Sequence, residues 1–388
     1  MSRTACFLGL SWTLVLILAA ACNSSSSGGE GQGSPDAAGG DASSGSSGGS
    51  SGSGSSSGAS GSSSGSSSGA GSGGGVTTLA MSPDPQFLAV DAKNVYWTDL
   101  GSSGGGSTQT GSVFSVPIDG GTVVTLATGL PGPGGIAVDA TDVYWVDFGV
   151  ISPPGDVMKV PIGGGSPVML ATSSNGGTPT HIAIDANNVY WTDGNAVWQV
   201  PKSGGTPVMV ADAQGELTSG VAVDSSYVYW TNEVGGGDAG PENSGSVMKA
   251  PIGGGTAAAI ATGQNIPLAV QVDATSVYWV NQGDVTMADG MVMKAPLAGG
   301  SPVTLATGQD IIFDLAIDST TLYWNDWGNQ TVNPPKVTGA IASVPLGGGT
   351  PTTIAAQAQT YDVVVDGTSL YASINHVSSG SIVKITPK

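Results

Sequence analysis

The chain of 388 residues contains few of the residues that cross-link a fold or carry out catalysis. Its two cysteines, Cys6 and Cys22, both precede residue 23, and its two histidines are His181 and His376. A disulfide framework is therefore excluded beyond residue 22. Stability there must come from the packing of apolar side chains, and few groups remain for nucleophilic or metal-based catalysis.

Basic residues are also scarce. The chain has 9 lysines and arginines against 28 aspartates and glutamates, a net charge of -19, and Arg3 is its single arginine. This balance repels phosphate backbones and anionic headgroups, which excludes nucleic-acid binding and favours cations or basic partners. The repeated GGG segments lack the Lys-Ser/Thr of a phosphate-binding loop.

The only long apolar run lies at the N-terminus. Residues 1–21 hold Arg3 followed by an apolar stretch that ends in small residues, which is typical of a signal peptide. The sequence LAAAC, which ends at Cys22, resembles the lipobox of bacterial lipoproteins. We expect acylation of Cys22 and a location in the cell envelope, at the outer membrane or cell surface. Because the lipobox match is imperfect, cleavage after Ala21 and secretion is the alternative.

Residues 22–75 consist mostly of serine and glycine. A segment with no large apolar side chains cannot offset the entropy lost on ordering, so the composition predicts a flexible tether. With about fifty residues, such a tether would hold a domain roughly 40 Å from its anchor.

Residues 76–388 contain seven copies of one motif, of which LAVDAKNVYWTD (88–99) is the first. Its tyrosine recurs at intervals of 39 to 49 residues, at Tyr96, Tyr144, Tyr190, Tyr229, Tyr278, Tyr323 and Tyr371. A period in the forties with four short apolar segments per copy is the signature of a β-propeller blade. We therefore predict an all-β fold, a seven-bladed β-propeller of four-stranded blades.

The second copy illustrates the strands that we expect. They are 136–139, 143–147, 156–162 and 166–172, which are rich in Val, Ile, Tyr and Trp. The adjacent Tyr144 and Trp145 should face opposite sides of the sheet, toward the two neighbouring blades. Asp139 ends the first strand, where its carboxylate can accept hydrogen bonds from the N–H groups of a tight turn.

The two ends of the domain predict how the ring closes. The segment 76–80 matches the fourth strand of the other copies, whereas the seventh copy stops after its third strand. Pairing of 76–80 with 381–387 would complete the last blade and remove an exposed sheet edge.

The motif resembles the YWTD, or class B, repeat of the low-density lipoprotein receptor group. Six of the seven copies keep Tyr-Trp, and two of those keep the following Thr-Asp. The resemblance implies the propeller fold, but propellers include binders, scaffolds and enzymes alike. The receptor domains of that group have six blades rather than seven, so their binding surfaces are not expected to carry over. Bacterial propeller lipoproteins with Ser/Gly tethers are a nearer likeness.

Loop lengths indicate the functional face. The turns between first and second strands are short and uniform, whereas the loops between second and third strands are long and differ in every copy. Variable loops on a rigid scaffold commonly carry function. Most of the acids outside the turns fall on this side, which we call the top face, including Asp84, Asp212, Glu216, Glu233, Asp238, Glu242, Asp284, Asp289 and Asp310; the one base among these loops is Lys336.

Two candidate sites follow from these positions. His181, Asp314 and Asp362 occupy equivalent places near the start of the first strand of their copies, so they should surround the mouth of the central channel. Together they could hold a divalent cation such as Ca²⁺, although no cofactor is clearly indicated. Trp327, an aromatic residue in a long top-face loop, could stack on a sugar or pack on its own blade.

Two hypotheses of function remain. The first is a surface-tethered binding module with no catalysis, expected to be monomeric, whose partner is an envelope protein, a glycan or a cation. The second is a metal-assisted lyase or lactone hydrolase at the channel mouth. A lyase of that kind would need a histidine and metal-binding carboxylates on the top face, and His181 with Asp314 is the pairing that the sequence offers.

Overall fold

The structure is a computed structural model that describes residues 75–101, 111–149, 155–173, 177–212, 217–233, 243–282, 288–328, 339–357, 359–375 and 380–388. These residues form seven four-stranded antiparallel sheets and contain no helix. Accordingly, the described part of the chain offers no helical segment suited to crossing a membrane. The predicted signal peptide and tether, including Cys22, lie outside the described residues.

Each sheet is one blade; in six blades the strands follow in sequence order from the channel outward, and in the seventh β1 is the outermost strand. The innermost strands are β2 (Pro85–Val90), β6 (Pro133–Val138), β10 (Pro179–Ile184), β14 (Leu217–Val223), β18 (Pro267–Val272), β22 (Leu315–Ile317) and β26 (Thr360–Val365). The second strands are β3 (Asn94–Asp99), β7 (Asp142–Asp147), β11 (Asn188–Asp193), β15 (Tyr227–Glu233), β19 (Ser276–Asn281), β23 (Thr321–Asp326) and β27 (Leu370–Ile374). The third strands are β4 (Gly111–Pro117), β8 (Asp156–Pro161), β12 (Ala196–Pro201), β16 (Gly245–Pro251), β20 (Gly290–Pro296), β24 (Ala340–Pro345) and β28 (Gly380–Thr386). The outer strands are β5 (Val124–Leu130), β9 (Val168–Thr172), β13 (Val208–Asp212), β17 (Ala258–Gln264), β21 (Val303–Gln309), β25 (Thr352–Ala356) and β1 (Gly75–Ser82).

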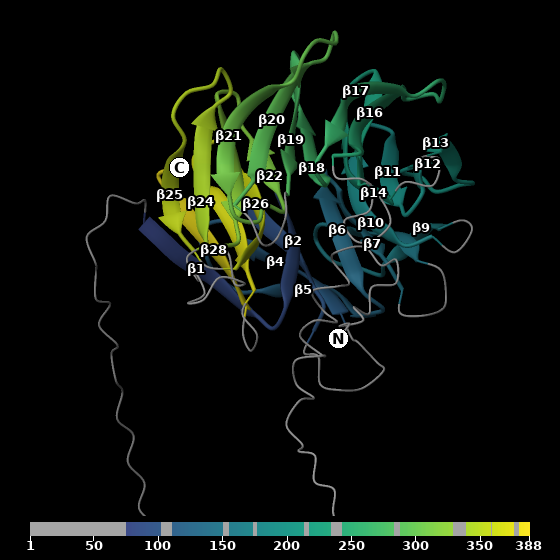
Figure 1. The fold of residues 1–388 in the computed structure, drawn as a ribbon. Helices are drawn as coiled ribbons and strands as arrows, with labels where there is room; N and C mark the ends of the chain where they lie inside the picture. Colours follow the sequence, from purple (N-terminus) through teal and green to yellow (C-terminus); the bar gives the residue numbers. More distant parts are fainter. Residues whose placement is uncertain are drawn as a thin grey trace, which may run out of the picture. The chain divides into compact units, whose positions relative to one another are not determined.

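The ring closes as the sequence predicts. Strand β1 pairs antiparallel with β28, with Thr78 opposite Val383 and Ser82 opposite Gly380, so that the seventh blade contains strands from both ends of the domain. Figure 1 shows the purple strand β1 beside the yellow strand β28. Each innermost strand also contacts the innermost strand of the next blade around the whole ring, including β26 with β2. The prediction of seven blades is confirmed.

The adjacent Tyr and Trp of the second strands form the layers between blades. In six interfaces a buried tyrosine packs in one cluster with the buried tryptophan of the following blade, as Tyr144 does with Trp191. The pairs are Tyr96–Trp145, Tyr144–Trp191, Tyr190–Trp230, Tyr229–Trp279, Tyr278–Trp324 and Tyr371–Trp97. In the remaining interface Ala372 replaces the tryptophan opposite Tyr323, and Ile341 and Ile374 belong to the same cluster. The two aromatics therefore face opposite sides of each sheet, as predicted.

The innermost strands start earlier than the sequence suggested. We expected the first strand of blade 2 to begin at Ile136, but β6 begins at Pro133, which pairs with Asp147. The register shifts between Pro133 and Ile136, so a bulge carries the strand through the two intervening glycines. Proline is tolerated here because the first residue of a strand need not donate to the ladder.

Glycine and proline form a tight joint between several neighbouring blades. Gly155 directly precedes the third strand of blade 2, and a Cβ at this position would lie 2.3 Å from Cδ of Pro179, which begins blade 3. Equivalent contacts join Gly111 to Pro133, Gly245 to Pro267 and Gly380 to Pro85. The absence of a side chain at these glycines lets the proline ring of the next blade approach the sheet closely.

The bottom face, opposite the top face, carries the turns between first and second strands. Each turn has an aspartate whose Oδ1 accepts two backbone N–H groups and whose Oδ2 accepts the hydroxyl of the tyrosine five residues later. These turn aspartates are Asp91, Asp139, Asp185, Asp224, Asp273, Asp318 and Asp366. Their predicted structural role is confirmed, and the bond to the tyrosine explains why the motif keeps both residues.

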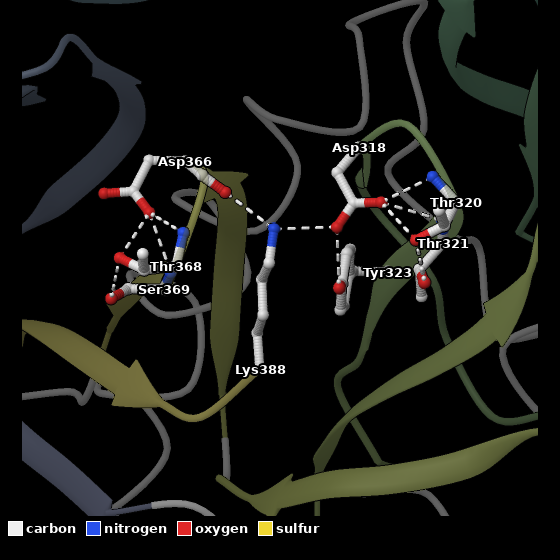
Figure 2. Close-up of polar contacts among 8 residues, drawn as sticks. All are labelled: Asp318, Thr320, Thr321, Tyr323, Asp366, Thr368, Ser369 and Lys388. Atoms are coloured by element: carbon white, nitrogen blue, oxygen red, sulfur yellow. Dashed lines mark hydrogen bonds and ion pairs between the residues drawn. The ribbon is translucent and has the colours of Figure 1, made fainter.

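Lysines complete the bottom face. All described lysines except Lys93 place Nζ over a tyrosine ring, 4.8 to 6.0 Å from its centroid. Lys202 also binds Oδ2 of Asp139 in the preceding blade at 2.7 Å. Lys388, at the equivalent place after the last strand, joins Asp318 Oδ2 at 2.7 Å to the carbonyl of Asp366 at 2.6 Å (Figure 2). Several lysines of this face are therefore paired with carboxylates, within a blade and between blades.

Candidate functional site

The mouth of the channel is built from one equivalent position near the start of each innermost strand. The seven residues there are Phe87, Gly135, His181, Gly220, Ala269, Asp314 and Asp362. At Gly135 and Gly220 a Cβ would meet the backbone of the next blade, at 2.9 Å from Cα of His181 and 2.5 Å from the carbonyl oxygen of Leu268. The chemically distinctive side chains at the mouth therefore come from blades 1, 3, 6 and 7.

Five aromatic rings lie in contact across this mouth. Trp327 packs edge-on against Phe313 at 5.4 Å between ring centroids, and Phe313 stacks on Tyr361 at 5.8 Å. Tyr361 meets Phe87 at 5.5 Å, and Phe87 meets His181 at 5.3 Å, both edge to face. We call these five residues the mouth cluster. Tyr361 is buried, whereas the other four are half-buried and keep part of their surface exposed.

Two carboxyl groups lie beside the mouth cluster. Oδ2 of Asp314 accepts the N–H of Val363 at 3.2 Å, and Oδ2 of Asp362 accepts the N–H of Leu88 at 2.6 Å. Each aspartate thus bonds to the innermost strand of the following blade. The two carboxyls are also hydrogen-bonded to each other.

The carboxyl pair shares a proton. Burial, followed by the neighbouring charge of Asp362, raises the pKa of Asp314 well above its ordinary value. Burial also raises the pKa of Asp362, while hydrogen bonds from Asp314 and from backbone N–H groups offset part of this rise.

His181 does not join these carboxylates in a metal centre. Its ring packs on Phe87, and its Nδ1 lies 3.1 Å from Oγ1 of Thr180. Burial lowers the pKa of His181 to about 4, so the imidazole is neutral at physiological pH. Among the described residues, which include His181, Asp314 and Asp362, no group of three His, Cys, Asp or Glu side chains could hold a metal ion. The three predicted mouth residues are at the mouth, but only the two aspartates are brought together.

Asp84 adds a third carboxylate near the cluster. It accepts hydrogen bonds from Nδ2 of Asn375 and, at 2.7 Å, from Nε2 of Gln86. Burial raises the pKa of Asp84 to about 6, and the charge of Asp99 contributes to the rise. Burial, followed by the electrostatic effect of Asp362, Asp84 and Asp314, raises the pKa of Tyr361, so the buried ring of the cluster lies in a negative potential.

Further carboxyls on the top face are buried at the ends of second strands. Burial raises the pKa of Asp147 to about 7 and that of Asp193 to about 6, and it raises the pKa of Glu233 to about 7. Asp147 lies opposite Asp156 in the sheet, and its Oδ1 is buried without a hydrogen-bond partner. The described lysines all belong to the bottom face, so none of them compensates these charges.

The sequence located this site only in part. Trp327 packs on Phe313 of its own blade, which was one of its two predicted roles, and its backbone N–H donates to the carbonyl of Ile311 at 2.8 Å. Phe313 and Tyr361 were not predicted, although each directly precedes an aspartate that was. The repeated aromatic–Asp pair is the signal that could have found them. Glu216, Asp238, Glu242, Asp284 and Lys336 lie outside the described residues.

Comparisons with known proteins add to the description of the fold. No protein-family profile and no curated protein sequence matches the chain. Virginiamycin B lyase from Staphylococcus aureus, solved with quinupristin, is similar in structure with a TM-score of 0.60 at 11% identity, over 80% of this chain and 99% of that chain. The GH74 enzyme of Niastella koreensis gives 0.52 at 15% identity, over 76% of this chain and 51% of that chain. A nidogen/laminin complex gives 0.46 at 19% identity, over 62% and 88%.

The chain is a seven-bladed β-propeller with YWTD-like repeats. At identities below 25%, the similarities to the lyase and to the GH74 enzyme show a shared fold alone.

Proposed function

We propose that this protein is a non-catalytic binding module that presents the top face of its propeller to a partner at the bacterial cell envelope. One observation carries the proposal, namely the mouth cluster of partly exposed rings framed by Asp84, Asp314 and Asp362. Partly exposed aromatic residues at the centre of a rigid face are common anchors of protein recognition.

The use of the mouth carboxyls favours binding over catalysis. Asp314 and Asp362 each accept a backbone N–H of the next blade, and they bond to each other. A general acid or base needs a carboxyl that can reach the substrate. Here both groups are engaged in joining blades 6, 7 and 1, which is a structural use.

The contrast with the bottom face supports the choice of the top face. On the bottom face one arrangement of turn aspartate and tyrosine recurs in all seven blades, and lysines pair with several of these turns. Such repetition is what the fold itself requires. The top face instead differs from blade to blade, as expected of a surface that recognises one partner.

The site can be tested by capture of partners from solubilised envelope. The mature chain would be immobilised as wild type, as Trp327→Ala and as Tyr227→Leu, the last of which removes a partly exposed bottom-face ring. We expect a partner retained by wild type and Tyr227→Leu to be lost from Trp327→Ala. Retention by Trp327→Ala together with loss from Tyr227→Leu would place binding on the other face and refute the proposal.

Anchoring is proposed from Cys22, the signal peptide 1–21 and the tether 22–75. A tether of this length would hold the propeller roughly 40 Å from the lipid. Metabolic labelling with a radioactive fatty acid tests this part separately. We expect label and membrane fractionation in the wild type and neither in Cys22→Ser; a secreted, unlabelled wild type would show that the leader is an ordinary signal peptide.

A further inference from the structure

We infer that the mouth cluster recognises a cationic side chain, a lysine or an arginine of a basic peptide segment in the partner. This inference rests on the proposed function and specifies the chemistry of the partner. It follows from the ring geometry at the mouth, the charges around it and the distribution of lysines between the two faces.

The rings provide the first part of the argument. Trp327, Phe313, Phe87 and His181 are half-buried, so each is fixed by its neighbours while part of it remains accessible. Aromatic faces attract cations through their quadrupoles, and the attraction strengthens when the cation leaves water. The neutral His181, whose pKa is lowered to about 4, adds no opposing charge.

The carboxylates provide the second part. Asp84, Asp314 and Asp362 all act electrostatically on Tyr361, at the centre of the cluster. Asp84 is bonded to two neutral amides, from Asn375 and Gln86, which leave its charge uncompensated. A cation above the rings would meet both the aromatic faces and this negative potential.

The lysines provide an internal precedent. On the bottom face the protein already pairs ammonium groups with tyrosine rings beside aspartates, as Lys202 does over Tyr144 and against Asp139. The mouth cluster combines the same ring and carboxylate chemistry, but no described lysine of the chain lies there. The missing cation is therefore expected from the partner.

The geometry favours a basic side chain over a neutral sugar or a bare metal ion. Three of the four ring contacts are edge to face, with interplanar angles of 82°, 86° and 90°, so the cluster is not a flat platform for a sugar ring. A metal ion would need a group of ligands that is absent among the described residues. An ammonium or guanidinium group needs neither a flat aromatic platform nor a set of metal ligands.

The test measures binding of the mature chain to three labelled hexapeptides, hexalysine, hexaglutamine and hexaglutamate. We expect hexalysine to bind at low salt and the other two not to bind. Trp327→Leu and Phe313→Leu should each weaken hexalysine binding at least tenfold, and Asp84→Asn should weaken it severalfold. Tyr227→Leu on the bottom face should leave it unchanged, and thermal unfolding of every variant verifies that it is folded.

The alternative outcomes are distinct. Equal hexalysine affinity in the wild type and all top-face variants would mean diffuse attraction to an acidic protein and would overturn the inference. Binding of a neutral oligosaccharide, lost in Trp327→Leu and without hexalysine binding, would overturn the inference while leaving the proposed function intact. If the top-face variants also retain the envelope partner that the bottom-face variant loses, both the inference and the proposed function are contradicted.

Discussion

The two faces of the propeller shift the pKa values of carboxyl side chains in opposite directions. On the bottom face the pKa values of Asp139, Asp185, Asp273, Asp318 and Asp366 lie below the ordinary value, because hydrogen bonds from lysine, tyrosine and backbone N–H groups outweigh the effect of burial. On the top face burial dominates and raises the pKa values of Asp84, Asp147, Asp193, Glu233, Asp314 and Asp362.

This difference separates what maintains the fold from what is available for binding. A carboxylate supported by several donors stabilises the turn that contains it. A buried carboxylate with too few donors costs free energy, which a cationic partner could recover. Sequence repetition follows the same division, since the bottom-face aspartates recur in all seven copies and the mouth residues do not.

The largest loss of stability is expected from substitution in the aromatic layers between the blades. Trp191 is fully buried in the cluster that contains Tyr144, so Trp191→Ala should lower the free energy of unfolding by about 3 to 5 kcal/mol. Trp327→Ala, at the half-buried mouth, should cost less than about 1 kcal/mol. Urea unfolding of both variants measures the contrast. A loss below about 1 kcal/mol for Trp191→Ala would show that the repeated layer does not hold the blades together.

A matched pair in blade 2 tests the opposition of the faces directly. Asp139 accepts Lys202, Tyr144 and two backbone N–H groups, so Asp139→Asn should destabilise by about 1 to 3 kcal/mol. Asp147 is buried opposite Asp156 with one oxygen unpartnered, so Asp147→Asn should stabilise the protein at pH 8 by roughly 1 kcal/mol. Equal losses from both substitutions, in chemical unfolding at pH 8, would contradict the division.

The features of the structure that the sequence predicted are those that recur in every copy of the motif. The blade number, the closure by β1 and β28, and the opposite faces of Tyr and Trp were predicted because seven copies report each feature. The turn aspartates were assigned correctly for the same reason. The strand bounds were predicted less well, since the expected first strand of blade 2 began at Ile136 and did not include the bulged segment from Pro133.

The mouth cluster could not be predicted because it consists of departures from the repeat. Phe87 and Tyr361 lie in contact although they come from the first and last copies, and only ring closure brings them together. His181 reaches Phe87 from blade 3, a contact that no local pattern encodes. Equivalent positions in the repeat identified the channel mouth, but not which of its side chains would meet.

Stability should decrease as pH rises from 5 to 8. A carboxyl with a raised pKa in the folded chain contributes stability that is fully present below the unfolded pKa of about 4 and is lost as pH rises through the folded value. That loss extends from about pH 4 to about pH 6 for Asp84 and Asp193, and to about pH 7 for Asp147 and Glu233. The bottom-face aspartates have lowered pKa values, so their contribution is lost only below about pH 4.

Melting temperatures between pH 4.5 and 8.5 measure this dependence. In Asp147→Asn the melting temperature should fall less as pH rises to about 7, because one of the groups with a raised pKa is removed. A melting temperature that stays level or rises between pH 5 and pH 8 would show that the top-face carboxyls are better solvated than their burial implies.

The smallest loss of stability is expected from substitution of Lys388, which connects blades 6 and 7 on the bottom face (Figure 2). Lys388→Met keeps most of the aliphatic stem but loses the ion pair with Asp318 and the bond to the carbonyl of Asp366. Because lysine and aspartate are about 15% and 17% exposed, the loss should be about 1 kcal/mol, near the upper end for a surface pair. Lys93→Met, at an exposed turn position, is the control and should change nothing measurable. The Lys388 effect should shrink in high salt, and an effect that salt leaves unchanged would assign it to packing of the stem over Tyr323 rather than to charge.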